Sequence, residues 1–166
     1  WDDYIVEYDI ELRVPPNAAL NLSTVNKGEI VVDGVHGDFE VRNVNGAITL
    51  RGLRGSGEAV TVNGAIDVTF EQAPAGPTLF KTVNGRIEAG FPRDLSADIA
   101  FKTMHGEIWT DFDAEAIAVQ PTSEATREGT RYVIRADRSS MIRIGAGGPT
   151  HSFETLNGDI YVVEAP

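Results

Sequence analysis

The sequence predicts an all-β solenoid, a fold in which short strands wind through stacked coils. Three observations lead to this class: a ten-residue repeat occurs six times, each copy alternates apolar and polar residues, and most copies contain an Asn-Gly pair. Self-similarity at a nearly constant period is typical of repeat architectures, and alternation with a period of two is typical of strands. The copies begin at Ser23 (STVNKGEIVV), Val41 (VRNVNGAITL), Ala59 (AVTVNGAIDV), Phe80 (FKTVNGRIEA), Phe101 (FKTMHGEIWT) and Phe153 (FETLNGDIYV).

The spacing of the copies predicts about seven coils of 18–21 residues in a single domain spanning residues 1–166. Ile142 lies 18 residues before Ile160, which indicates a degenerate coil inside the longest interval. Residues 113–129 are rich in Glu, Thr, Ser and Ala, and we expect them to leave the coil path as a loop excursion. The anchoring isoleucines of the six copies are Ile30, Ile48, Ile66, Ile87, Ile108 and Ile160, at intervals of 18, 18, 21, 21 and 52 residues.

Each copy has one apolar face, which we expect inside, and one mostly charged face. In the fourth copy Phe80, Thr82 and Ile87 share the apolar face, whereas Lys81 and Val83 share the other. The Asn-Gly pair between the two strands is expected to form a sharp corner, with glycine supplying a positive φ. The predicted core is Leu20, Leu22, Ile30, Phe39, Val41, Ile48, Leu50, Ile66, Val68, Phe80, Ile87, Phe101, Ile108, Ile142, Ile144, Phe153, Ile160 and Val162.

Two architectures fit this pattern. Asn-Gly is a common hairpin turn, so an antiparallel meander or barrel is one of them. In the other, the copies stack in register as parallel coils about 4.8 Å apart, which places identical residues above one another. The constant phase of Thr, Asn and Ile favours the parallel stack, with Ile30, Ile48, Ile66, Ile87 and Ile108 as successive neighbours.

The chain also resembles a bacterial adhesin-like family of unknown function. The resemblance rests on ELRVPPNAALNLSTVNKGEI, the TVNG copies, FPRDLSADIAFKTMHGEIWTDF and GGPTHSFETLNGDIYV; the departures are Lys27, His105 in place of Asn, and residues 113–129. It implies a right-handed, single-stranded parallel β-helix and a bacterial cell-envelope context, but it supplies no catalytic residues. We therefore expect an extracytoplasmic location, in the periplasm or at the cell surface, with a signal or anchor removed from this chain.

Composition limits the classes of partner. Fourteen Lys and Arg against 25 Asp and Glu give a formal net charge of −11 at pH 7, which repels nucleic acids and anionic lipids. The absence of cysteine excludes disulfides and thiolate zinc sites, and no stretch approaches the ~18 apolar residues that a membrane helix needs. We expect no nucleic-acid partner and no direct membrane insertion by this chain.

Two rows of polar residues recur at fixed positions of the repeat. The asparagine row is interpreted as a structural ladder at the corners, with a polar binding row as the alternative. The threonine row shares the apolar face, so it is expected to point inward and not to form an ice-binding array. The ladder comprises Asn26, Asn45, Asn63, Asn84, His105 and Asn157, and the threonines are Thr24, Thr61, Thr82, Thr103 and Thr155.

No motif predicts catalysis, a metal or a cofactor. The three histidines lack metal-ligand spacing and are expected at surface or corner positions. Asp111 and Asp113 flank Phe112 and are interpreted as lying on one solvated strand face; the alternative is a carbohydrate-active enzyme or glycan-binding site on this acidic face. Ser139 and Ser140 lack a G-x-S-x-G context, so they do not predict a hydrolase triad. The segment GAGG leads into Pro149 and not into a helix, so it does not predict a phosphate loop.

One apolar row falls on the charged face. One interpretation is that the row is buried, because the bends reverse the alternation locally or because another segment of the chain covers it. The other is that the row is a groove for a partner or for self-association. The sequence thus favours a non-enzymatic binding or scaffold module of the bacterial envelope, whose partner is an unknown protein or glycan, with a homo-oligomer as a further expected form. The row consists of Val44, Val62, Val83, Met104 and Leu156.

Overall fold

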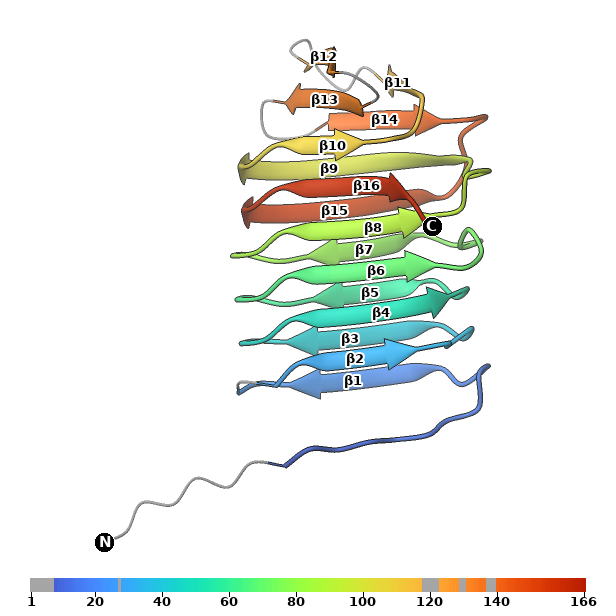
Figure 1. The fold of residues 1–166 in the computed structure, drawn as a ribbon, viewed down its shortest axis with the longest axis vertical. Helices are drawn as coiled ribbons and strands as arrows, with labels where there is room; N and C mark the ends of the chain where they lie inside the picture. The colour runs from blue at the N-terminus through green and yellow to red at the C-terminus, as the bar shows by residue number, and fades with distance from the viewer. Residues whose placement is uncertain (1–7, 27, 118–122, 129–130, 137–139) are drawn as a thin grey trace, which may run out of the picture.

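The computed structural model describes residues 8–26, 28–117, 123–128, 131–136 and 140–166, and side chains outside 118–139. Within these residues the protein is all-β, with no helix and sixteen strands in two eight-stranded sheets (Figure 1). Most neighbouring strands are parallel. The all-β class and its parallel character are as the repeat predicts.

The sheets are built by strands that alternate between them from β1 to β10. We call each such pair of successive strands, one in each sheet, a rung. The first sheet has the order β1 (Leu20–Thr24), β3 (Phe39–Asn43), β5 (Gly57–Val60), β7 (Thr78–Lys81), β15 (Thr150–Asn157), β9 (Ala97–His105), β14 (Ser140–Ile144) and β11 (Ala114–Ile117). The second has the order β12 (Ser123–Glu128), β13 (Arg131–Ala136), β10 (Ile108–Thr110), β16 (Ile160–Glu164), β8 (Ile87–Phe91), β6 (Ile66–Phe70), β4 (Ile48–Leu53) and β2 (Ile30–Asp33).

The isoleucine register is parallel at the start of the stack. Ile30, Ile48, Ile66 and Ile87 are successive partners in β2, β4, β6 and β8. The Asn-Gly pairs link strands of different sheets and do not close hairpins, so the meander alternative is wrong for these copies. The expected contact between Ile87 and Ile108 is also wrong, because both pair with Ile160 of the last rung.

The last rung, β15–β16, is therefore inserted between β7–β8 and β9–β10 (Figure 1). Charge explains why this order is favourable. Glu154 lies between Lys81 and Lys102 in the register, and its carboxylate is 3.0 Å from the Lys81 ammonium. Stacking in chain order would place the two lysines opposite each other, and like charges in directly opposed positions destabilise a sheet.

Aromatic packing supports the same order. The Phe153 ring lies between those of Phe80 and Phe101, with centroids 5.4 and 5.8 Å away and nearly parallel planes. All three rings are buried. The inserted rung thus satisfies an outer charge row and an inner aromatic row at once.

The expected degenerate coil at Ile142 is not a parallel rung. Its strand, β14, pairs antiparallel with β9, and β11 pairs antiparallel with β14. Ile142 and Ile144 are buried as expected, because parallel and antiparallel strands share the two-residue period and the apolar pattern does not fix strand direction. Six parallel rungs are present within the described residues, where the sequence predicts about seven coils.

Residues 118–122 and 129 of the predicted excursion lie outside the described residues, but its described parts, residues 113–117 and 123–128, leave the path of the rungs and are not only loop. They contribute β11 and β12, and β12 pairs antiparallel with β13, which in turn lies antiparallel to β10. These antiparallel strands occupy the end of the stack beyond β9–β10 (Figure 1).

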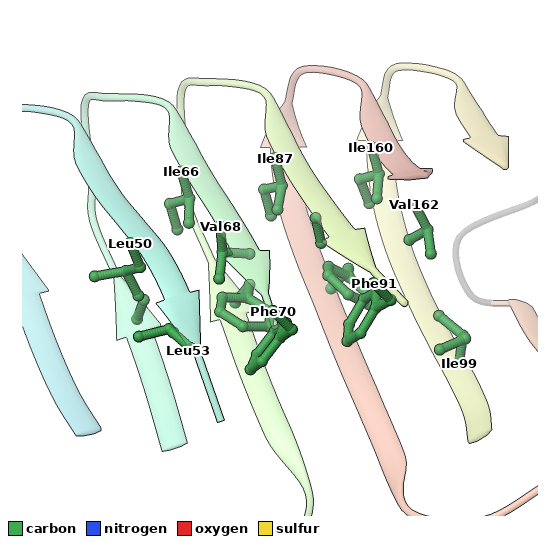
Figure 2. Close-up of a cluster of buried hydrophobic side chains, with 14 of the residues drawn as sticks. Leu50, Leu53, Ile66, Val68, Phe70, Ile87, Phe91, Ile99, Ile160 and Val162 are labelled. Carbon is green, nitrogen blue, oxygen red and sulfur yellow. The ribbon is translucent and has the colours of Figure 1, made fainter. Parts of the chain in front are cut away.

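The core fills the space between the two sheets, as Figure 2 shows for its middle part. Every residue of the predicted core is buried except Leu20, Leu22 and Ile30, which are partly exposed in the terminal rung. The prediction omitted large residues at strand ends, which lie outside the ten-residue repeat. They are Leu53, Phe70 and Phe91, at the ends of β4, β6 and β8, and the rings of Phe70 and Phe91 stack with centroids 4.9 Å apart (Figure 2).

Glycine is needed at the corners for a different reason from the expected one. Gly46, Gly64 and Gly85 are not among the positive-φ glycines of the chain. Instead, a Cβ on Gly85 would overlap the carbonyl oxygen of Gly64, and a Cβ on Gly64 would overlap that of Gly46. The corners of adjacent rungs therefore approach more closely than any side chain allows.

The inward threonines satisfy these glycine carbonyls. Thr61 donates to the Gly46 carbonyl oxygen at 3.0 Å, and Thr82 donates to that of Gly64 at 3.0 Å. Thr155 does the same for Gly85 at 3.1 Å. These three threonines and Thr103 are buried, as predicted, whereas Thr24 in the terminal rung is partly exposed. Each hydrogen-bonded hydroxyl holds one rung against the next.

We predict that Gly64→Ala destabilises the fold by at least about 2 kcal/mol, because its methyl group has no room between stacked corners. Gly28→Ala is the matched control, since Gly28 occupies the same place in the terminal rung and its Cβ would meet nothing closer than 3.3 Å. Urea unfolding of both variants measures the difference. Equal stabilities would contradict the close-approach explanation.

Candidate interaction surface

The Asn-Gly corners bring two rows of side chains together along one edge of the molecule. Each corner joins a strand of the first sheet to the strand that follows it in the second sheet, and each parallel rung has one such corner. One row consists of the ladder asparagines, and the other consists of the apolar residue that precedes each of them.

The asparagine amides form a continuous hydrogen-bonded ladder. Asn63 donates from Nδ2 to Asn45 Oδ1 at 2.9 Å, and Asn84 donates to Asn63 Oδ1 at 2.8 Å. Asn157 donates to Asn84 Oδ1 at 2.8 Å, so the inserted rung extends the ladder. Each amide both donates and accepts, and such chains polarise and strengthen one another.

The two ends of the ladder differ from the expectation in detail. Asn45 donates to the Val25 carbonyl oxygen at 3.3 Å, so it is the backbone next to Asn26 that receives this bond. At the other end His105 Nδ1 lies 3.1 Å from Asn157 Oδ1, and because that oxygen is an acceptor, Nδ1 carries the proton. His105 therefore replaces asparagine as the terminal donor.

The apolar row points outward, as its position in the repeat predicts. We call Val44, Val62, Val83, Leu156 and Met104, in their spatial order, the corner stripe. Met104 is 59% exposed, Val44, Val62 and Leu156 are between 36% and 38% exposed, and Val83 is half-buried. Local reversal at the bends does not bury these residues. Val25, 58% exposed in the terminal rung, extends the stripe by one position.

Charged side chains of opposite sign lie beside the corner stripe. Arg42 forms ion pairs with Glu40 on its own strand and with Glu58 on the next. The hydrogen bond to Glu58, together with the negative charges of Glu40 and Glu58, raises the pKa of Arg42. Lys81 pairs with Glu154. The negative charge is thus interleaved with basic residues on this face, and adjacent rungs are joined by ion pairs across their strands.

Asp111 and Asp113 do not share a strand face. β10 ends at Thr110, so both aspartates follow the strand: Asp111 is half-buried in a bend, and Asp113 is exposed between that bend and β11. Phe112 between them is buried and its backbone amide donates to the Thr110 hydroxyl at 3.2 Å. The expected solvated strand face is therefore replaced by a bend anchored on a buried aromatic ring. Across the part of the chain that the structure describes, no cluster of three or more His, Asp or Glu side chains could hold a metal ion.

The histidines occupy three different environments. His105 lies at a corner, and the His36 Nε2 atom is 3.8 Å from a Glu71 carboxylate oxygen. His151 is fully buried, where a surface or corner position was expected. Its Nδ1 atom lies 3.0 Å from the Thr78 hydroxyl, its ring stacks on Phe91, and its Nε2 atom has no hydrogen-bond partner.

The GAGG segment is a strap and not a phosphate loop. It connects β14 to β15 across the start of β9, and the Gly147 carbonyl oxygen accepts a hydrogen bond from the Ser96 hydroxyl at 2.9 Å. Gly145 and Gly147 have φ angles of 60° and 78°, where glycine is favoured. Arg143 holds Asp98 beside the strap in a bidentate pair at 2.8 and 3.0 Å, which lowers the pKa of Asp98.

A second exposed apolar feature lies outside the repeat, near the start of the chain. Tyr8, Ile10, Leu12 and Val14 alternate with charged residues, and all four are exposed. Alternation with a period of two predicts a strand, although this segment matches no copy of the repeat. That signal was available in the sequence.

Comparisons of this chain with protein-family models, curated proteins and solved structures gave no match. No helix long and apolar enough to cross a membrane occurs in the described ranges.

We predict that His151 makes the fold sensitive to acid. Burial lowers the pKa of His151 from 6.5 to about 4, so protonation favours the unfolded chain. The contribution of neutral His151 to the free energy of unfolding is complete above pH 6.5 and decreases as the pH falls toward 4. Below pH 4 it is lost, a change of about 3 kcal/mol.

The comparison of His151→Leu with the parent chain measures this effect by urea unfolding at pH 7 and pH 4. Because leucine does not titrate, the variant should lose about 3 kcal/mol less than the parent between these pH values. His105→Asn is the control and should retain the full loss, since His105 is exposed at a corner. If His151→Leu shows the same pH dependence as the parent chain, His151 is not the cause of the acid sensitivity.

Proposed function

We propose that this chain is a rigid, non-enzymatic binding or scaffold module of the bacterial cell envelope, which engages a protein partner through the corner stripe. The observation that carries the proposal is the stripe itself: five apolar side chains, most of them exposed, in register on successive rungs. Contiguous exposed apolar side chains mark interaction sites more often than isolated ones do.

We further propose that the two sheets are opposite walls of a single-stranded, right-handed parallel β-helix. The alternation of strands between the sheets and the in-register parallel pairing support this reading. Connections between parallel strands of one sheet are right-handed in nearly all proteins, which supports the handedness. In such a fold the stripe follows the long axis of the molecule.

The geometry suits an extended protein segment. Neighbouring stripe residues follow the strand spacing of about 4.8 Å, and the ladder and threonine bonds fix each corner. A fixed surface loses little conformational entropy when a partner binds, so modest apolar contacts suffice for affinity. The basic and acidic side chains beside the stripe supply polar contacts at its rim.

The proposed location is extracytoplasmic, in the periplasm or at the cell surface, as the resemblance implies. The formal net charge of −11 supports a protein partner over nucleic acid or an anionic lipid surface, both of which the chain repels.

A glycan-binding role around Asp111 and Asp113 is the second candidate. Two carboxylates on either side of a buried aromatic ring, in a bend at the end of β10, can accept hydrogen bonds from sugar hydroxyls. The glycan site would lie near the end of the stack, next to β10, whereas the corner stripe runs along one edge of the stack.

Binding to isolated bacterial envelopes tests the two candidates. We expect retention of the labelled chain to be sensitive to protease treatment of the envelopes and to fall about tenfold in Val62→Glu, which places a charge in the stripe. Val31→Glu is the matched control, because Val31 is 55% exposed on another face. Circular dichroism checks that both variants fold.

A different pattern would replace the proposal with the glycan-binding one. Retention that survives protease, is unaffected by Val62→Glu and is lost in Asp111→Asn with Asp113→Asn would place the site at the bend. Loss of the β signal in Val62→Glu would show that Val62 is a core residue and would overturn the stripe.

A further inference from the structure

Residues 8–14 have the sequence of an amphipathic strand but no strand partner within the described residues. Tyr8, Ile10, Leu12 and Val14 are 83%, 79%, 70% and 43% exposed, and they alternate with Asp9, Glu11 and Arg13 in the sequence YDIELRV. Four apolar side chains on one side of an extended segment are unusual on a protein surface unless something covers them.

The segment leads directly into the open end of the stack. The Pro16 carbonyl oxygen accepts from the His36 amide at 2.7 Å, and the Leu20 amide donates to the Asp38 carbonyl oxygen at 2.9 Å. Residues 16–20 thus lie next to residues 36–38, which connect β2 to β3. Residues 8–14 continue from there past the end of the stack that β1 and β2 form, which we call the free end (Figure 1).

The free end has partly exposed apolar side chains and strand edges that pair with no other described strand. β1 and β2 are the terminal strands of their sheets, so each has one edge without a partner among the described strands. Leu20, Leu22 and Ile30 are partly exposed there, whereas their equivalents in the next rung are buried; these are Phe39, Val41 and Ile48. Edges of this kind are sites for pairing with another strand.

The two ends of the stack are unlike, which limits how copies could associate. The far end consists of the antiparallel strands β11, β12, β13 and β14, so it does not continue the parallel stacking. Head-to-tail growth therefore has no matching surface among the described strands. Association through the free end alone joins two identical patches and closes as a two-fold dimer.

We propose that residues 8–14 of two copies pair as antiparallel strands across a two-fold axis at Leu12, forming a dimer that covers both free ends. In this register Glu11 of each copy lies opposite Arg13 of the other, and Ile10 lies opposite Val14. Leu12 faces Leu12. The apolar side of the paired strands then packs against the free ends, where Leu20, Leu22 and Ile30 are partly exposed.

Charge selects this register over its neighbours. Parallel in-register pairing would place Glu11 opposite Glu11 and Arg13 opposite Arg13, which is destabilising. Antiparallel pairing centred on Glu11 would place Asp9 opposite Arg13 but would also oppose the two Glu11 side chains, whereas the register centred on Leu12 opposes no like charges. In the single chain Arg13 pairs with its own Glu11 at 3.2 Å, with side chains 92% and 78% exposed. Such an exposed pair contributes little, so it exchanges readily for the pairs between copies.

A charge exchange tests the register. Sedimentation equilibrium should show a dimer for the parent chain and at least about tenfold weaker dimerisation for Arg13→Glu and for Glu11→Arg, because each single change opposes like charges twice. The double variant restores opposite charges and should restore the dimer. Circular dichroism at low temperature should show the same β content in all three, since both side chains are exposed. The two single variants should melt earlier than the parent chain, because dimerisation stabilises the folded state.

A cysteine scan supplies an independent readout, because the chain contains no cysteine. Leu12→Cys should form an intermolecular disulfide under mild oxidation, since residues on the two-fold axis of antiparallel strands have Cα atoms about 4.5–5.5 Å apart, within disulfide range. Val62→Cys, which is also exposed but lies on the corner stripe, should not.

The proposal fails if the parent chain is monomeric, if the double charge variant does not recover, or if Val62→Cys cross-links in place of Leu12→Cys. The last result would move self-association to the corner stripe. Envelope binding that is lost in Val62→Glu but kept in Arg13→Glu would show that the proposed function stands whether or not the dimer does.

Discussion

The close contact between corner glycines is the constraint on which the rest of this structure depends. The Gly64 carbonyl oxygen occupies the place where a side chain of Gly85 would begin, and the buried Thr82 hydroxyl donates to that oxygen. Once adjacent corners are fixed in this way, the strand residues that flank a corner lie above their equivalents in the next rung. The isoleucine ladder, the asparagine ladder and the corner stripe all follow from that register.

Register, and not chain order, decides which rungs are neighbours. Phe153, Glu154 and Asn157 each fit a row formed by earlier rungs: aromatic inside, charged outside and amide at the corner. The last rung therefore completes three rows when it enters between β7–β8 and β9–β10. The strap that carries the chain there needs glycines at positive φ and the Ser96 hydroxyl to hold it.

The repeat was sufficient to predict the strands, the inward threonines and the outward stripe, because these depend only on alternation within a copy. It could not predict the position of Ile160, since near-identical copies are interchangeable and nothing local tells β16 which neighbour to choose. Strand direction around Ile142 was equally invisible, because both directions share one period. Phe91 and His151 were missed because both lie outside the repeat, and Asp111 and Asp113 because β10 ends just before them.

The inserted rung has a consequence for how the chain must fold as it is made. Contacts such as that between Thr78 and His151 join residues 73 positions apart, so they cannot form until residue 151 has been synthesised. Before then β9 has the vacant edge of β7 as an alternative partner, in a register that opposes Lys81 and Lys102. That repulsion disfavours the premature pairing of β9 with β7, so the charge row on the surface favours an edge of β7 that stays unpaired until β15 is available.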